Sequence, residues 1–146
     1  MRDAAGVTTD PRIELQQASL RVTRPRLAVL EVLADEPHLD TDTIIGRVRE
    51  KHGSVSHQAV YDVLRALTSA GLVRRIQPAG SNARYEARVG DNHHHAVCRS
   101  CGEIVDVECA VGHVPCLTAP GGHGFVVDEA EVVYWGTCSD CAAAAT

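Results

Sequence analysis

The chain has 146 residues, of which 45% are hydrophobic and 23% are charged. This length suits one ordinary domain or two small ones and excludes a large catalytic barrel. The apolar runs fall far short of the ~20 residues that a membrane-spanning helix needs, and the first 18 residues lack the apolar core of a secretory signal. We therefore expect a cytoplasmic protein without a membrane partner.

Charge and potential metal ligands are distributed unevenly along the chain. Residues 1–90 contain 13 of the 14 Lys and Arg against 11 acidic residues, a net charge of +2. Residues 91–146 contain one Arg against eight acidic residues, a net charge of −7, together with all six cysteines and five of the eight histidines. This change predicts two domains. We place a DNA-binding domain at 1–87, a hinge at 88–92 and a metal-binding domain at 93–146.

Hydrophobic spacing predicts four helices in the first domain. They cover 13–19, 24–35, a third segment that ends at Gly53 and a fourth that ends before Gly71. The expected N-caps are Thr23 for the second helix, Asp40 or Thr41 for the third, and Ser54 or Ser56 for the fourth. Two short strands, 72–76 and 83–87, flank the turn residues 78–82 and predict a hairpin.

Helices followed by a two-stranded hairpin indicate a winged helix-turn-helix, so the expected fold class is α+β. In such a module the fourth helix enters the major groove, while basic residues elsewhere approach phosphates or the minor groove. The expected DNA-binding residues are Arg21, Arg24, Arg26, His57, Gln58, Tyr61, Arg65, Arg74, Arg75 and Arg84. A helical bundle with solvated arginines remains the alternative. Asp62 on the same face counts against DNA binding because a carboxylate repels phosphate, although it could accept a hydrogen bond from a cytosine amino group.

The second domain contains two C-x-x-C pairs. Four thiolates at this spacing are typical of a closed tetrahedral zinc site, which would hold the two ends of a small domain together. The expected structural zinc ligands are Cys98, Cys101, Cys138 and Cys141. Disulfides and a thioredoxin-type redox motif are the alternatives, and a reducing cytoplasm disfavours the first. Between the pairs, residues 124–127 and 131–135 are expected to form strands.

A histidine run precedes the first pair. On a strand, His93 and His95 project from one face and His94 from the other. Glu86 and Asp106 are the nearby carboxylates that could complete a mixed nitrogen and oxygen site for Fe²⁺, Mn²⁺ or Zn²⁺. A surface histidine run without any ion is the alternative.

Taken together, these residues resemble the ferric uptake regulator family of metal-dependent repressors, from Ile13 to Cys141. The resemblance rests on residues 21–26, on 56–61 and on the histidine run that leads into Cys98. It implies a homodimer with an N-terminal winged helix and a C-terminal α/β dimerisation domain that carries a structural zinc on the four cysteines. It also implies a regulatory Fe²⁺ or Mn²⁺ site that spans both domains, formed by His38, Glu86, His93, His95 and Asp106.

Within the family, the sequence is most similar to the actinobacterial peroxide-responsive repressors associated with catalase-peroxidase genes. Residues 92–95, 108–119 and 128–136 carry this likeness. It implies that Fe²⁺ reacts with hydrogen peroxide and that a ligand histidine, His38 or His93, is oxidised, which releases a palindromic operator in double-stranded DNA. In many members an additional metal site uses further His and acidic residues; here His94 matches it, while Asn92 stands where a histidine is common.

Other functions remain open at this point. The same ligands could serve a repressor that responds to iron supply. Cys109 and Cys116 lie outside the zinc pairs and could form a disulfide under oxidant, or they could be buried small side chains. An iron oxygenase is the alternative from a different class, but it would leave the arginine-rich half without a role. We expect no enzymatic activity.

Overall fold

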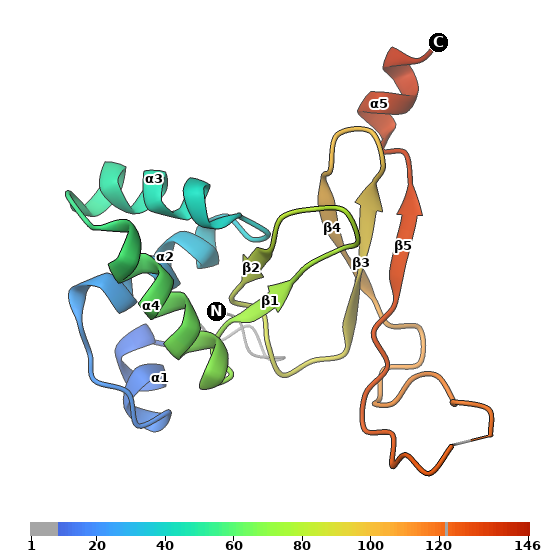
Figure 1. Cartoon of the computed structure of the whole chain (residues 1–146), viewed down its shortest axis with the longest axis horizontal. Helices are drawn as coiled ribbons and strands as arrows, with labels where there is room; N and C mark the ends of the chain where they lie inside the picture. Colours follow the sequence, from blue (N-terminus) through green and yellow to red (C-terminus); the bar gives the residue numbers. More distant parts are fainter. Residues whose placement is uncertain (1–8, 122) are drawn as a thin grey trace. The chain divides into compact units, whose positions relative to one another are not determined.

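The computed structural model describes residues 9–121 and 123–146, so the first eight residues of the predicted DNA-binding domain lie outside the described part. The chain divides into two compact units between Val89 and Gly90. The first unit contains four helices and a hairpin, and the second contains a small sheet and a short helix (Figure 1). Each unit has its own secondary structure and its own buried side chains.

Four helices form the N-terminal unit, and each begins at a side chain that caps it. The caps are Asp10, Thr23, Asp40 and Ser56, whose oxygens accept hydrogen bonds from backbone amides in the first turn. The helices are α1 (Pro11–Gln17), α2 (Arg24–Asp35), α3 (Thr41–His52) and α4 (His57–Ser69). The structure thus selects Asp40 and Ser56 from the alternatives. No helix in the described ranges is both long and apolar enough to traverse a bilayer.

The helices of this unit pack around α2, which contacts α1, α3 and α4. Its side chains Val29 and Leu33 are buried together with Ile44 from α3 and Leu64 from α4. Leu15 joins the same core from α1. The spacing of these apolar residues places them on one face of each helix, so the opposite face of α4 remains exposed.

A hairpin completes the winged helix. Strands β1 (Arg74–Ile76) and β2 (Arg84–Glu86) pair antiparallel, and both are shorter than the predicted strands. Residue Leu39, which precedes α3, forms an isolated bridge with Tyr85, and backbone hydrogen bonds of 2.9 Å run in both directions between 38–39 and Tyr85. The segment that carries His38 is therefore fixed to β2 of the hairpin.

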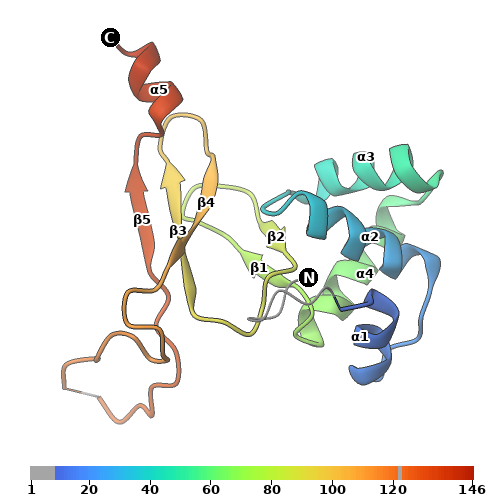
Figure 2. The same cartoon turned by 180° about the vertical axis from the view of Figure 1, so that it is seen from behind.

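The C-terminal unit is a three-stranded sheet followed by one helix. Its elements are β3 (His93–Cys98), β4 (Ile104–Glu108), β5 (Val133–Gly136) and α5 (Ser139–Ala144). The strand order is β4-β3-β5, with β3 antiparallel to β4 and parallel to β5. Helix α5 and the turn between β3 and β4 lie at one end of the sheet, whereas the long connection from β4 to β5 extends from the other end (Figures 1 and 2).

The predicted strand at 124–127 is wrong. Gly124 belongs to a turn with a φ of +80°, and residues 125–130 have no regular structure. A strand needs a neighbour to pair with, and both edges of β3 are taken, one by β4 and the other by β5, which forms at 133–136 instead of the predicted 131–135. Phe125 and Val126 are consequently 79% and 97% exposed.

Candidate metal centres and DNA-binding surface

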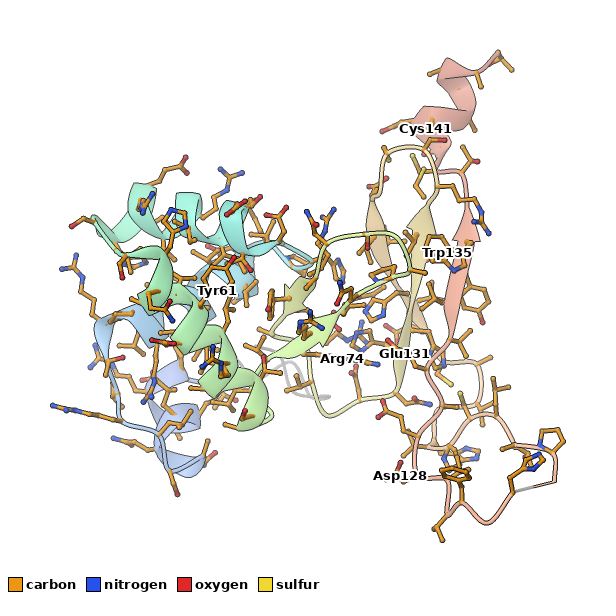
Figure 3. The ribbon with its side chains drawn as sticks, in the orientation of Figure 1. Tyr61, Arg74, Asp128, Glu131, Trp135 and Cys141 are labelled. Atoms are coloured by element: carbon orange, nitrogen blue, oxygen red, sulfur yellow. The ribbon has the colours of Figure 1, made fainter. Side chains whose placement is uncertain are left out.

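The cysteines of the two C-x-x-C pairs, Cys98, Cys101, Cys138 and Cys141, form one four-cysteine cluster, as the sequence predicts. Their sulfur atoms all lie within 4.8 Å of one another. The end of β3 and the turn after it supply the first pair, while the second pair comes from the N-terminus of α5 (Figure 3 labels Cys141). The Sγ atoms of Cys101 and Cys138 are 3.7 Å apart, which matches the about 3.8 Å between sulfurs in a tetrahedron with zinc-sulfur bonds of about 2.3 Å.

Backbone amides prepare this cluster for a cation. Hydrogen bonds from the backbone of Cys138 and Cys101 lower the pKa of Cys98 to about 6. Hydrogen bonding with the Cys138 and Cys101 side chains raises the pKa of Cys141 to about 12, because neighbouring sulfurs disfavour a second thiolate. A divalent cation at the centre would stabilise all four thiolates at once. The donor set therefore fits Zn²⁺.

A histidine and a carboxylate are paired inside the N-terminal unit. The Nε2 atom of His38 lies 3.1 Å from the Oε2 atom of Glu86, and both side chains are buried. His38 has a φ of +64°, a left-handed conformation that is uncommon outside glycine. The backbone hydrogen bonds to Tyr85 hold His38 in this conformation, and they place its ring beside the next residue of β2, Glu86.

A second group of ligands lies within the C-terminal unit. Antiparallel pairing places Asp106 on β4 directly opposite His95 on β3. The Oδ1 atom of Asp106 is 3.6 Å from Nε2 of His95 and 3.7 Å from Nε2 of His93. Nδ1 of His93 lies 2.7 Å from Oδ1 of Asp91, which can orient the ring. The alternation on the strand thus brings His93, His95 and Asp106 together.

These two groups have a common donor chemistry. Each combines imidazole nitrogen with carboxylate oxygen and contains no thiolate, a set that suits Fe²⁺ or Mn²⁺ as well as Zn²⁺. The buried positions of the imidazoles and of Glu86 make hydrogen-bond or metal partners necessary for their polar atoms. The residues expected at the regulatory site are therefore arranged as ligands within each unit.

The exposed face of α4 carries the residues expected to read DNA. His57, Gln58, Tyr61 and Arg65 are all exposed, and Figure 3 labels Tyr61 on this helix. Asp62 lies among them: its Oδ1 accepts a hydrogen bond of 2.9 Å from Nε2 of Gln58 and is 3.9 Å from Nη1 of Arg65. The carboxylate therefore holds two polar side chains of this face in the absence of DNA.

The other expected DNA-binding arginines differ in their surroundings. Arg26 donates a hydrogen bond of 2.7 Å to the carbonyl of exposed Arg21, and Arg24 donates to the carbonyl of His52. On the hairpin, Arg75 is exposed and donates to Gln77, and Arg74 is half-buried. Arg84 is half-buried and donates to the carbonyl of His38 at 3.3 Å, a structural contact that sequence spacing did not indicate.

Among residues 9–121 and 123–146, the structure brings together a further cluster of potential ligands, formed by His94, Cys109 and Cys116. The sequence predicts a candidate redox pair of the two cysteines but does not connect them with His94. Strand alternation places His94 on the face opposite His93, which was the available signal. The return of the β4–β5 connection to that face depends on tertiary structure.

Comparison with known proteins identifies the relatives of this chain. Residues 17–132 match the model of the ferric uptake regulator family. The transcriptional regulator FurA of Mycobacterium tuberculosis is 68% identical over 128 residues, which cover 88% of this chain and 87% of that protein.

Solved structures have the same fold. The ferric uptake regulator of Vibrio cholerae has a TM-score of 0.68 at 23% identity, and the match covers 88% of this chain and 100% of that one. The regulator of Pseudomonas aeruginosa, whose structure was solved with manganese, has a TM-score of 0.67 at 26% identity, covering 90% and 99%.

Proposed function

The chain belongs to the ferric uptake regulator family of metal-binding, DNA-binding transcriptional regulators, and we propose that it is a peroxide-sensing repressor. In this proposal, a homodimer with Fe²⁺ or Mn²⁺ at its regulatory sites binds a palindromic operator in the cytoplasm. Hydrogen peroxide then oxidises the iron form and releases the DNA. Its targets are oxidative-stress genes such as catalase-peroxidase, together with its own gene. The protein is a regulator and not an enzyme.

The observation that carries the proposal is the pair of His and carboxylate groups, one in each unit. His38 and Glu86 are held together on one side of the proposed hinge at 88–92, and His93, His95 and Asp106 on the other. We propose that one ion binds both groups. Because an ion with ligands from both units favours the arrangement that satisfies all of them, its binding selects one arrangement for DNA.

Several features support a dimer with a structural zinc. Zinc at the four-cysteine cluster would join the turn after β3 to α5 at one end of the sheet, in a unit with few buried side chains. The same unit exposes large apolar side chains, including Phe125, Val126, Tyr134 and Trp135. Large apolar side chains exposed to solvent are typical of an interaction site, and the family's dimerisation domain is where such a site is expected. A second copy of the chain is the proposed partner.

Two copies of α4 account for the proposed operator symmetry. In a two-fold dimer, each copy of the helix reads one half-site, and the half-sites lie about 34–36 Å apart, one turn of DNA. Tyr61 and Arg65 are exposed at the centre of the reading face. Arg21 and Arg75 provide exposed positive charge for phosphates.

The peroxide response is assigned to the regulatory ligands. Fe²⁺ held by these ligands would supply one-electron chemistry with hydrogen peroxide. The net change at the protein is the transfer of one oxygen atom to an imidazole carbon of His38 or His93, and the second peroxide oxygen leaves as water. An oxidised imidazole is a poorer ligand, so the ion and the selected arrangement are lost.

Fluorescence anisotropy under anaerobic conditions tests this proposal. Full-length protein without regulatory metal, with Mn²⁺ and with Fe²⁺ is titrated onto DNA from its own promoter, before and after a micromolar dose of peroxide. We expect metal-dependent binding, release of DNA from the Fe²⁺ form alone, and a mass gain of one oxygen on a peptide that contains His38 or His93. The variant His113→Asn, which removes an exposed histidine, is the matched control and should behave as the wild type.

Two other outcomes would replace this mechanism. Release from both metal forms that a thiol reductant reverses would assign sensing to Cys109 and Cys116, whose sulfurs lie within 4.8 Å of each other. Metal-dependent binding without release from either form would identify a repressor that responds to iron supply.

A further inference from the structure

A cluster of potential metal ligands lies on the face of β3 opposite His93, away from the four-cysteine cluster. It consists of His94, Cys109 and Cys116. Their nearest ligand atoms all lie within 4.8 Å of one another, and Nε2 of His94 is 3.3 Å from Sγ of Cys116. His94 is 3% exposed, and both cysteines are half-buried. All three residues lie in the C-terminal unit. The cluster is therefore a local feature of the sheet and its β4–β5 connection.

Hydrogen bonds from a side chain and from the backbone hold Cys109 in place. Cys109 directly follows β4, and its Sγ accepts hydrogen bonds from Nδ2 of Asn92 at 3.2 Å and from the amide of Gly112 at 3.4 Å. The same Asn92 amide donates to the carbonyl of His113 at 2.9 Å, which ties the loop to the start of β3. Amide donors to sulfur are the usual surroundings of a thiolate that ligates a metal, because they stabilise its charge.

The ring of His94 lacks an adequate polar partner. Its Nδ1 atom is buried and has no hydrogen-bond partner among the residues that the structure describes. Its Nε2 atom faces a sulfur, which is a weak hydrogen-bond partner. Burying an imidazole without a strong partner on either nitrogen destabilises the fold, since buried polar atoms are normally hydrogen-bonded. A metal ion shared by Nε2 and the Cys116 sulfur would replace this weak contact with two strong bonds.

We propose that His94, Cys109 and Cys116 form a second thiolate metal site that binds Zn²⁺ through three protein ligands. In a tetrahedral zinc site, nitrogen and sulfur ligands lie about 3.6 Å apart and two sulfurs about 3.8 Å apart, so small side-chain movements complete the site. The fourth position is left for water or another ligand. Two thiolates and one imidazole distinguish this site from the four-cysteine cluster and from the ligands that contain only nitrogen and oxygen.

Zinc at this position would fix the β4–β5 connection to β3. His94 is the residue between His93 and His95 on the strand, so the bond to its ring anchors the backbone that carries both regulatory histidines. Bound zinc would also keep the two sulfurs from forming a disulfide with each other. This inference is independent of the signal that the regulatory site detects.

Cobalt substitution in the full-length protein tests the site. Reduced protein is treated with a mild chelator until one zinc per chain remains, in the four-cysteine cluster, and is then titrated anaerobically with Co²⁺. We expect a thiolate-to-cobalt charge-transfer band in the near ultraviolet, because the regulatory ligands contain no sulfur. The variants Cys109→Ser and Cys116→Ser should lose the band, and His94→Ala should weaken cobalt binding by about tenfold or more.

The controls keep the result specific. His113→Asn removes an imidazole from the same loop and should leave the band unchanged. Circular dichroism and retention of one zinc per chain verify that each variant folds. Absence of the band in wild-type protein, or its persistence in Cys109→Ser and Cys116→Ser, would overturn the proposal. Neither result would affect metal-dependent DNA binding, which is measured separately with the peroxide assay.

Discussion

Replacing Asp62 by Asn should strengthen DNA binding and make it more sensitive to salt. Asp62 is exposed on α4, in the middle of the proposed reading face. Its carboxylate accepts a hydrogen bond from Gln58 and lies 3.9 Å from the guanidinium of Arg65. Asn retains the size and the acceptor oxygen for Gln58 but removes the charge that attracts Arg65 and repels phosphate.

The size of the effect follows from the number of phosphates contacted. Asp62→Asn leaves Arg65, 76% exposed, to contact one phosphate in each half-site. Each such contact steepens the plot of log K against log salt by about 0.9, so a dimer should gain about 1.8. At about 0.15 M salt this corresponds to about 30-fold tighter binding as an upper limit. The loss of the exposed helix pair itself should change the stability of the fold by only about 0.3–0.5 kcal/mol.

Anisotropy titrations over a range of salt concentrations measure both quantities. Manganese-loaded protein avoids oxidation during the series. The matched control is Glu50→Gln on α3, which removes the same charge from a similar pair: Glu50 lies 3.4 Å from Arg47 three residues earlier. Because Glu50 lies outside the reading face of α4, its replacement should leave the slope unchanged apart from a small general effect of net charge.

Two results would refute this reasoning. Equal slopes for wild type and Asp62→Asn would mean that Arg65 does not reach phosphate when it is released. Weaker binding of Asp62→Asn at every salt concentration, confined to operators with cytosine at one position, would mean that the carboxylate accepts a hydrogen bond from a base.

Three further predictions concern the stability of each unit. Cys98→Ser should abolish both zinc retention in the four-cysteine cluster and dimer formation, which metal analysis and size-exclusion chromatography measure. The control Ser100→Ala should preserve both. A stable zinc-free dimer of Cys98→Ser would contradict this prediction. Leu33→Ala should lower the free energy of unfolding by about 2–5 kcal/mol in urea titrations, because Leu33 is buried in the core around α2; a change below about 1 kcal/mol would show that the core collapses around the cavity. Hydrogen bonds from Thr43 lower the pKa of Asp40, so Asp40→Ala should cost about 1 kcal/mol at neutral pH. This stabilisation is present above the unfolded pKa of about 3.9 and is lost as pH falls through the lower pKa of the folded state. If the loss of stability in Asp40→Ala did not depend on pH, the charge of Asp40 would not be its cause.

Local signals in the sequence were sufficient for most of the N-terminal unit. Helix caps act on the first turn that follows them, so Thr23 and the apolar spacing of α2 predicted its bounds as the structure has them. The cysteine pairs were equally informative. Each C-x-x-C motif places two thiolates a few residues apart, and thiolates at this spacing are typical zinc ligands. Strand alternation is also a local rule, so it was enough to place His93 and His95 on one face of β3.

Predictions failed where a contact depends on distant partners. The sequence of 124–127 suits a strand, but no segment in the described part of the chain pairs with it, and its apolar side chains are left exposed. Arg84 shows the same limit, since its contact with the carbonyl of His38 requires the loop before α3 to return to β2.

The sequence by itself determined the family, the helical DNA-binding domain and the two C-x-x-C pairs of candidate zinc ligands, because each depends on motifs whose residues lie a few positions apart. Tertiary structure alone decided that Arg84 contacts the carbonyl of His38, 46 positions away in the chain, and that Cys116 meets His94 on the face of β3 opposite His93. The physical reason is that long-range meetings are set by how the sheet and its connections pack, and side-chain spacing along the chain contains little of that information.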